Sequence, residues 1–87
     1  LTTASISVSV YKKVNGVLIS WNKTENTTYN LLISDKKGKI IVNITTTNTS
    51  YFAYIPYGIY NVTIRATNQV GTNSTSFPIV FYIPPFI

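Results

Sequence analysis

The sequence predicts an all-β fold, a seven-stranded antiparallel β-sandwich in a single domain. Apolar and polar residues alternate with a period of two along nearly the whole chain, and no window of the sequence fits a helix better. Turn-forming residues recur about every ten residues, a spacing typical of sandwiches. The length of 87 residues suits one domain, 1–87, with one modest core.

A hairpin is expected to join the first two strands. The first strand is predicted over 5–10, where apolar residues alternate with serines, and the second over 17–21, where the alternation ends in a tryptophan. Between them, Asn15-Gly16 is the strongest short hairpin signal, because both residue types tolerate positive φ. We therefore expect these two residues to form the turn.

Five further strands follow the same alternation. A polar loop over 22–28 leads into the third strand, and a turn over 35–38 closes that strand. The sixth strand is expected to place Tyr60, Val62 and Ile64 on one face. The predicted bounds of these five strands are 29–33, 40–45, 51–54, 59–67 and 75–83.

The composition excludes most catalytic chemistry. The chain contains no Cys, His or Met, and its carboxylate side chains are Glu25 and Asp35. A cysteine or histidine nucleophile, a Cys/His zinc site and a disulfide are therefore impossible. A two-carboxylate mechanism would require Glu25 and Asp35 to converge, and both lie among turn-type residues. We predict that the protein is not an enzyme and uses no cofactor or metal.

Neutral polar residues replace charge on the predicted surface. Charged residues make up 10% of the chain, against about 25% in an ordinary domain, whereas there are 13 Thr, 8 Ser and 9 Asn. Of the cations that give the net charge of +5, three lysines surround Gly38 in a predicted turn, where they are well solvated. Nucleic-acid binding would favour arginines and aromatic residues on one face, so we expect no nucleic-acid partner.

The chain resembles a fibronectin type III domain over nearly its whole length. Trp21 matches that family's core tryptophan, and Tyr29 lies where its third strand carries an inward tyrosine. The stretch 54–60 is similar to the family's Leu-x-Pro-x-Thr-x-Tyr, with Tyr and Gly in place of the Leu and Thr, and puts Tyr60 at the tyrosine corner. The resemblance implies an immunoglobulin-like sandwich with these three aromatic residues and Val62 in its core.

The motif Asn-x-Ser/Thr, the acceptor sequence for N-glycosylation, is in excess. Nine asparagines and 21 hydroxyl residues would give about two such triplets by chance, and the chain has six. The alternative explanation is that Asn and Thr are both abundant in polar loops. Four of the motifs fall in predicted loops or turns, and the strand alternation points the other two outward. The predicted glycosylation sites are Asn22, Asn26, Asn43, Asn48, Asn61 and Asn73.

The composition as a whole resembles that of surface glycoproteins from acid- and heat-loving archaea. The shared features are low charge, many sequons and a bias toward Ile, Tyr, Asn and Thr. This resemblance implies an extracellular or cell-surface location and covalent N-glycans as attached groups.

Both ends of the chain are candidate assembly-forming strands. Segment 77–87 places apolar residues on both faces, and segment 1–10 is an alternating segment that a neighbouring copy could accept. If each copy covered the sheet edge of the next copy, head to tail, the result would be an open filament. Segment 77–87 also contains three prolines and is much shorter than a bilayer span, so we expect no transmembrane segment in this chain.

These features predict a non-catalytic structural subunit or module of an extracellular, N-glycosylated cell-surface assembly. It would belong to a filament, appendage or adhesion protein, with other copies of itself or neighbouring surface-protein domains as partners. One alternative is an accessory spacer domain of a secreted hydrolase. The other is a carbohydrate-binding module that stacks sugars on exposed tyrosines such as Tyr11, Tyr57 and Tyr82.

Overall fold

The structure is a computed structural model that describes residues 5–82. Within this range the chain forms seven strands and no helix, and the strands pair in antiparallel fashion in two sheets. The predicted all-β sandwich is thereby confirmed, whereas residues 1–4 and 83–87 of the two predicted assembly segments lie outside the described residues. The strands are β1 Val8–Lys13, β2 Gly16–Trp21, β3 Thr28–Asp35, β4 Ile40–Thr46, β5 Ser50–Ala53, β6 Gly58–Thr67 and β7 Thr72–Phe81.

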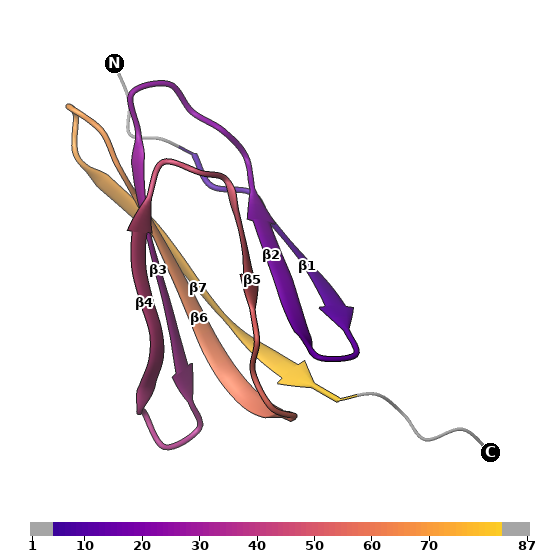
Figure 1. Ribbon diagram of the computed structural model, residues 1–87. Helices are drawn as coiled ribbons and strands as arrows, with labels where there is room; N and C mark the ends of the chain where they lie inside the picture. The colour runs from indigo at the N-terminus through magenta and orange to yellow at the C-terminus, as the bar shows by residue number, and fades with distance from the viewer. Residues whose placement is uncertain (1–4, 83–87) are drawn as a thin grey trace.

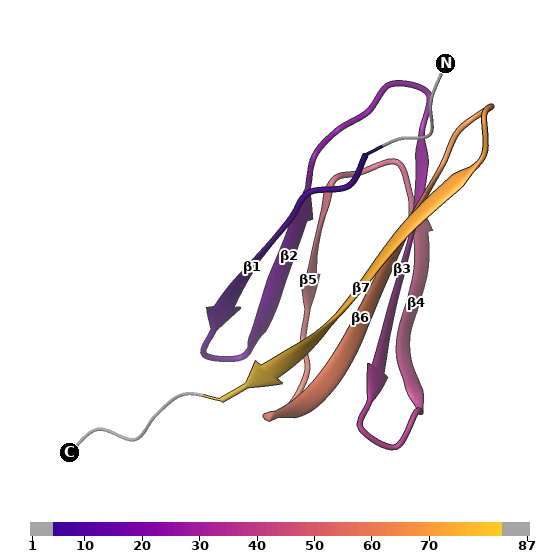
Figure 2. The same ribbon diagram turned by 180° about the vertical axis from the view of Figure 1, so that it is seen from behind.

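The two sheets contain three and four strands and face each other as two layers (Figures 1 and 2). The smaller sheet has the order β1-β2-β5, and the larger has the order β4-β3-β6-β7. The chain changes sheet after β2, after β4 and after β5, so each sheet combines strands that are distant in sequence. The described part of the molecule is elongated, with extents of 52 × 24 × 16 Å.

Successive connections lie at opposite ends of the long axis, because each strand reverses the direction of the one before it (Figure 1). One end contains the connections 22–27, 47–49 and 68–71, and we call it the amide end because asparagine side chains close its loops. Ser5 also lies here, bonded to Asn22.

The opposite end contains the connections 14–15, 36–39 and 54–57, and we call it the lysine end. Five of the seven cationic side chains lie in or beside these connections, and Tyr82 follows the end of β7 here. The five are Lys12, Lys13, Lys36, Lys37 and Lys39.

The core lies between the sheets and takes alternate residues from both. Burial alternates along β2 and β6, as the sequence pattern predicts. Trp21 and Tyr29 are 4% and 2% exposed, and their ring centroids lie 5.7 Å apart. Tyr60 and Val62 are buried too, so all four predicted core residues are confirmed. The buried hydrophobic residues are Val17, Ile19, Trp21, Tyr29, Leu31, Ile33, Ala53, Ile55, Tyr60, Val62, Ile64, Ala66, Ile79 and Phe81.

The first hairpin turn lies one residue earlier than predicted. Lys13 pairs with Gly16, so the turn residues are Val14 and Asn15, and neither Asn15 nor Gly16 has a positive φ. Gly16 is needed for packing instead, because a Cβ at this position would collide with the carbonyl oxygen of Ala53 on β5. The hairpin was predicted correctly and its turn residues were not, because the approach of β5 cannot be seen in the local sequence.

The last strand begins earlier than predicted. β7 pairs with β6 from Thr72, which lies opposite Thr67. The remaining turn, 68–71, is closed by Asn68, whose Oδ1 accepts hydrogen bonds from the amides of Val70 at 2.9 Å and Gly71 at 3.1 Å. Consequently Asn73, predicted to lie in a turn, lies within a strand.

Candidate functional sites: the sequon asparagines and the lysine end

The sequon asparagines are distributed unevenly over the molecule. Four lie in or near the amide end, and two lie on β4 and β6 of the larger sheet. Five of the six are exposed, and Asn22 is half-buried. The exposed five are Asn26, Asn43, Asn48, Asn61 and Asn73.

Asn43 and Asn61 occupy the outer face of the larger sheet. Asn43 lies opposite Leu32 of β3 and between the half-buried Val42 and Ile44, as predicted. Asn61 lies between the buried Tyr60 and Val62, so its side chain points away from the core. Neither side chain is needed to fill the core, and this leaves both open to modification.

Asn43 also shows how such an asparagine can be held and remain open. Asn30 on the neighbouring β3 donates from Nδ2 to Asn43 Oδ1 at 3.1 Å. The same Nδ2 donates to the Ile44 carbonyl oxygen at 2.9 Å. The amide of Asn43 is therefore oriented through its oxygen, and its nitrogen, the atom that N-glycosylation modifies, is not used in this contact.

Two of the remaining exposed sequon residues are in amide-end loops. Asn26 has a φ of 55°, a left-handed conformation that asparagine tolerates better than most residues. Asn48 is positioned by its backbone, whose N–H donates to Thr46 Oγ1 at 2.9 Å. Asn73, on β7, accepts a hydrogen bond at Oδ1 from the backbone N–H of Ser74 at 3.0 Å.

The two carboxylate side chains do not converge. Glu25 is exposed in the 22–27 connection at the amide end, and Asp35 ends β3 at the lysine end. Asp35 Oδ1 accepts hydrogen bonds from the backbone N–H groups of Lys37 and Lys39, each at 2.9 Å. Asp35 therefore closes its own turn, and the two carboxylates cannot act on the same bond.

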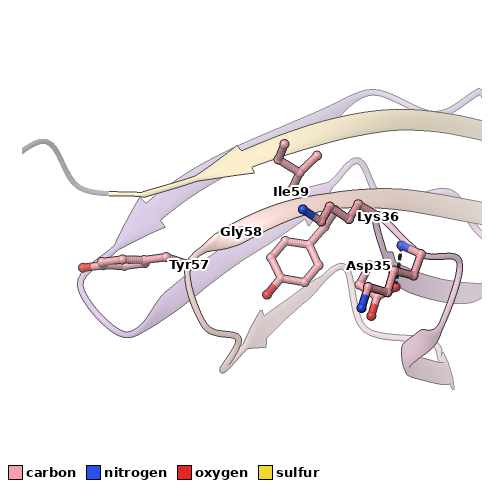
Figure 3. Close-up of a pocket in the computed structure, with 7 residues that line it drawn as sticks. Asp35, Lys36, Tyr57, Gly58 and Ile59 are labelled. Carbon is pink, nitrogen blue, oxygen red and sulfur yellow. Dashed lines mark hydrogen bonds between the residues drawn. The ribbon is translucent and has the colours of Figure 1, made fainter.

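A shallow hollow of about 460 Å³ lies at the lysine end, lined by residues 35–37 and 57–60 (Figure 3). Tyr60 donates its hydroxyl hydrogen to the Pro56 carbonyl oxygen at 2.6 Å, the contact expected of a tyrosine corner. Burial, and secondarily the negative charge of Asp35, raises the pKa of Tyr60 above its usual 10.0. Tyr60 is therefore a neutral donor near pH 7, and its hydroxyl, like the Asp35 carboxylate, is used in a hydrogen bond within the fold.

The tyrosines considered for sugar stacking are all exposed. Tyr11 is 51% exposed on the outer face of the smaller sheet, and Tyr57 and Tyr82 are 54% and 57% exposed at the lysine end. The ring of Tyr57 makes an edge-to-face contact with Phe81, with centroids 5.0 Å apart. This contact gives Tyr57 a packing role.

The sequence-based reasoning missed an apolar row on the outer face of the smaller sheet. Tyr11, Leu18 and Phe52 pair in register across β1, β2 and β5. Tyr54 extends the row, with its ring 4.6 Å from that of Phe52 and nearly edge-on. The spacing within single strands contains no sign of this row, because strand pairing alone brings its members together.

Metal-ligand clusters and long apolar helices are absent from the described residues. Among residues 5–82 there is no group of three or more His, Cys, Asp and Glu side chains that could hold a metal ion. A search of the same part of the chain for a helix with the length and apolar character of a membrane span found none.

Comparison with known proteins found two curated relatives, both named Kelch domain-containing protein, and no family model matches the chain. The protein from Sulfurisphaera tokodaii is 45% identical over 82 residues, which cover 94% of this chain and 11% of the relative. The protein from Saccharolobus solfataricus is 30% identical over 87 residues, which cover 98% of this chain and 12% of the relative. The chain thus spans about a tenth of the length of the curated relatives it matches.

Proposed function

We propose that this chain is a non-catalytic, N-glycosylated structural module of a larger extracellular cell-surface protein. The observation that carries the proposal is the placement of its sequons, since five of six sequon asparagines are exposed. Glycans at these positions would cover the amide end and part of the larger sheet with hydrophilic bulk. The low share of charged residues supports the proposal, because sugars would supply the hydration that charges usually provide.

The comparisons support the idea of a module within a longer protein. Kelch repeats are about 50 residues long, and each forms a four-stranded propeller blade. This chain instead forms a two-layer sandwich with seven strands in the described residues. We propose that the matching tenth of each relative is a separate domain beside its Kelch-type part. The strand order and the tyrosine corner favour a fibronectin type III-like domain.

The shape of the module fits a spacer. Ser5 lies at the amide end, where it is bonded to Asn22, and Tyr82 follows β7 at the lysine end, so neighbouring domains joined at these ends would be held apart along the long axis of the molecule. Its partners would then be adjacent domains of the same surface protein, together with covalent glycans.

Mass-spectrometric peptide mapping of the protein isolated from its native source tests this proposal. We expect sugar masses on several of the exposed sequon asparagines. We also expect that a protease or a biotin reagent added to intact cells cleaves or labels the protein. A protein without sugar on any sequon, or one that surface reagents reach only after lysis, would overturn the proposal.

A second candidate function, a filament subunit, is favoured by an apolar pair at a sheet edge. Ile59 and Val80 face each other across β6 and the edge strand β7 and are 51% and 47% exposed. Pro78 lies within the same edge strand and has no N–H to donate, which limits strand addition at β7. Electron microscopy of native material distinguishes the two functions, because regular fibres with one sandwich per repeat are expected only of a filament subunit.

A further inference from the structure

Asn22 differs from the other sequon asparagines in how its side chain is used. Its Oδ1 accepts a hydrogen bond from the backbone N–H of Ser7 at 2.7 Å, and its Nδ2 donates to the carbonyl oxygen of Ser5 at 2.9 Å. The backbone N–H of Asn22 also donates to the Ser7 carbonyl oxygen at 3.2 Å. Three hydrogen bonds from one residue therefore hold the segment that precedes β1.

These bonds extend the sheet beyond its last regular pair. The pairing of β1 with β2 ends at Val8 and Trp21, and the next pair would be Ser7 and Asn22. The side-chain amide of Asn22 presents an acceptor and a donor side by side, as a neighbouring strand would. Ile6, between the two bonded serines, packs half-buried against the core. The amide of Asn22 thus keeps Ile6 on the core.

N-glycosylation uses the same nitrogen atom. In that reaction Nδ2 forms a bond to the anomeric carbon of an activated sugar, one hydrogen of Nδ2 leaves as a proton, and the sugar's leaving group departs. The sugar takes the place of the hydrogen on the same side of the amide as Oδ1. An amide that pairs side-on with a strand, as Asn22 does with Ser5 and Ser7, donates this hydrogen. A sugar on Nδ2 would therefore occupy the space of the Ser5 backbone.

We propose that Asn22 holds residues 5–7 against the end of β2 through its hydrogen bonds, a role that we call the clamp. We propose further that Asn22 stays unmodified in the folded protein, although it lies in a sequon. This inference refines the proposed function, in which the exposed sequon asparagines carry the sugars. Asn43 is the informative contrast, because Asn30 contacts its oxygen and this contact leaves its nitrogen available.

Site-by-site glycopeptide mapping of the native protein tests the modification state. We expect Asn22 to be unmodified in more than about nine-tenths of molecules, whereas Asn43 and Asn61 carry sugar in most of them. Sugar on most copies of Asn22 would overturn the inference and leave the proposed function intact. If no sequon carries sugar, the proposed function fails. The hydrogen exchange of the two variants below then tests whether Asn22 holds the segment before β1.

Two variants, made in a host that does not glycosylate, test the clamp separately. Asn22→Ala removes the amide, and Thr24→Ala removes the sequon and leaves the amide in place. Thr24 is a suitable control because its contact with the Tyr29 hydroxyl, at 2.8 Å, is made by its backbone N–H. Hydrogen exchange at the Ser7 amide should become at least about tenfold faster in Asn22→Ala and stay unchanged in Thr24→Ala. Unchanged exchange in Asn22→Ala would refute the clamp.

Discussion

The two ends of the sandwich are closed by different chemistry. At the amide end, neutral groups close the loops: Asn68 accepts from two backbone amides, and the Tyr29 hydroxyl accepts from the Thr24 amide. At the lysine end, the Asp35 carboxylate closes a turn, and the Tyr60 phenol is bonded to Pro56. Because a neutral amide does not titrate, the turn closed by Asn68 is independent of pH, whereas the turn closed by Asp35 depends on an ionisable group, and each end also contains one bonded tyrosine hydroxyl.

The ends also differ in how tightly their backbones pack. Gly16 of the smaller sheet lies so close to Ala53 that a Cβ has no room, and most exposed apolar side chains lie near the same end. The amide end has instead four of the sequons and mostly polar loops. We therefore expect the largest loss of stability from substitutions at the lysine end, and we expect the exposed sequon positions of the amide end to tolerate bulk that Asn22 does not.

The largest expected effect is that of Gly16→Ala. The new methyl group would collide with the Ala53 carbonyl oxygen, so β2 and β5 must separate, and the free energy of unfolding should fall by about 3 kcal/mol. Gly58→Ala is the matched control at the same end, because its Cβ would meet Tyr60 atoms at an ordinary 3.4–3.5 Å. That control should lose less than about 1 kcal/mol. Urea denaturation measures both, and equal losses would contradict the assigned role of Gly16.

Tyr60→Phe should have the next largest effect. It removes the 2.6 Å hydrogen bond to Pro56 and should lower the free energy of unfolding by about 1–1.5 kcal/mol in urea denaturation. Tyr57→Phe is the control, since Tyr57 is 54% exposed and makes its ring contact with Phe81 through a part of the side chain that phenylalanine keeps. A loss as large in Tyr57→Phe would show that the Tyr60 hydrogen bond is not the cause.

Asn68→Ala tests the amide end. The substitution removes the acceptor for Val70 and Gly71 and should lower the free energy of unfolding by about 1 kcal/mol. Because a neutral amide is lost, the loss should be the same at pH 5 and pH 8. Asn68→Asp keeps an acceptor oxygen at this position and should lose less than Asn68→Ala. A loss in Asn68→Ala that changes between the two pH values would break the proposed contrast between the ends.

The smallest effect is expected in alkaline solution. The pKa of Tyr60 is raised in the folded state, so above about pH 10 the unfolded chain loses this proton first. Between the two pKa values the folded state binds more protons, and the free energy of unfolding therefore declines as the pH rises. Thermal melting between pH 9 and pH 11 should show a shallower decline in Tyr60→Phe than in the parent. An equal decline in both would exclude Tyr60 as its source.

Much of the fold could be predicted from residue spacing. Alternation marked all seven strands and the inward faces of Trp21, Tyr29 and Val62, because a strand with one buried face needs apolar residues at every second position. It also placed Asn43 and Asn61 on the surface. The prediction that Asn73 lies in a turn was wrong, because β7 extends its pairing with β6 through residues that locally favour a turn.

The roles of Gly16 and Asn22 could not be predicted in the same way. The decisive contact of Gly16 is with Ala53, and the decisive contacts of Asn22 are with Ser5 and Ser7. These contacts join segments that are far apart in sequence. A local pattern identifies Gly16 as a turn residue and Asn22 as a sequon residue. Each has a different role once the neighbouring strand is in place.

The sequence by itself determined the fold class, the inward residues of the strands and the absence of cysteine or histidine chemistry, because these depend on composition and on the two-residue repeat of a strand. Tertiary structure alone decided which backbone approaches too closely for a side chain, where the carboxylates lie and whether the nitrogen of a sequon asparagine is already bonded. The physical reason is that these properties depend on distances between strands, and hydrogen-bonded pairing of remote segments sets those distances.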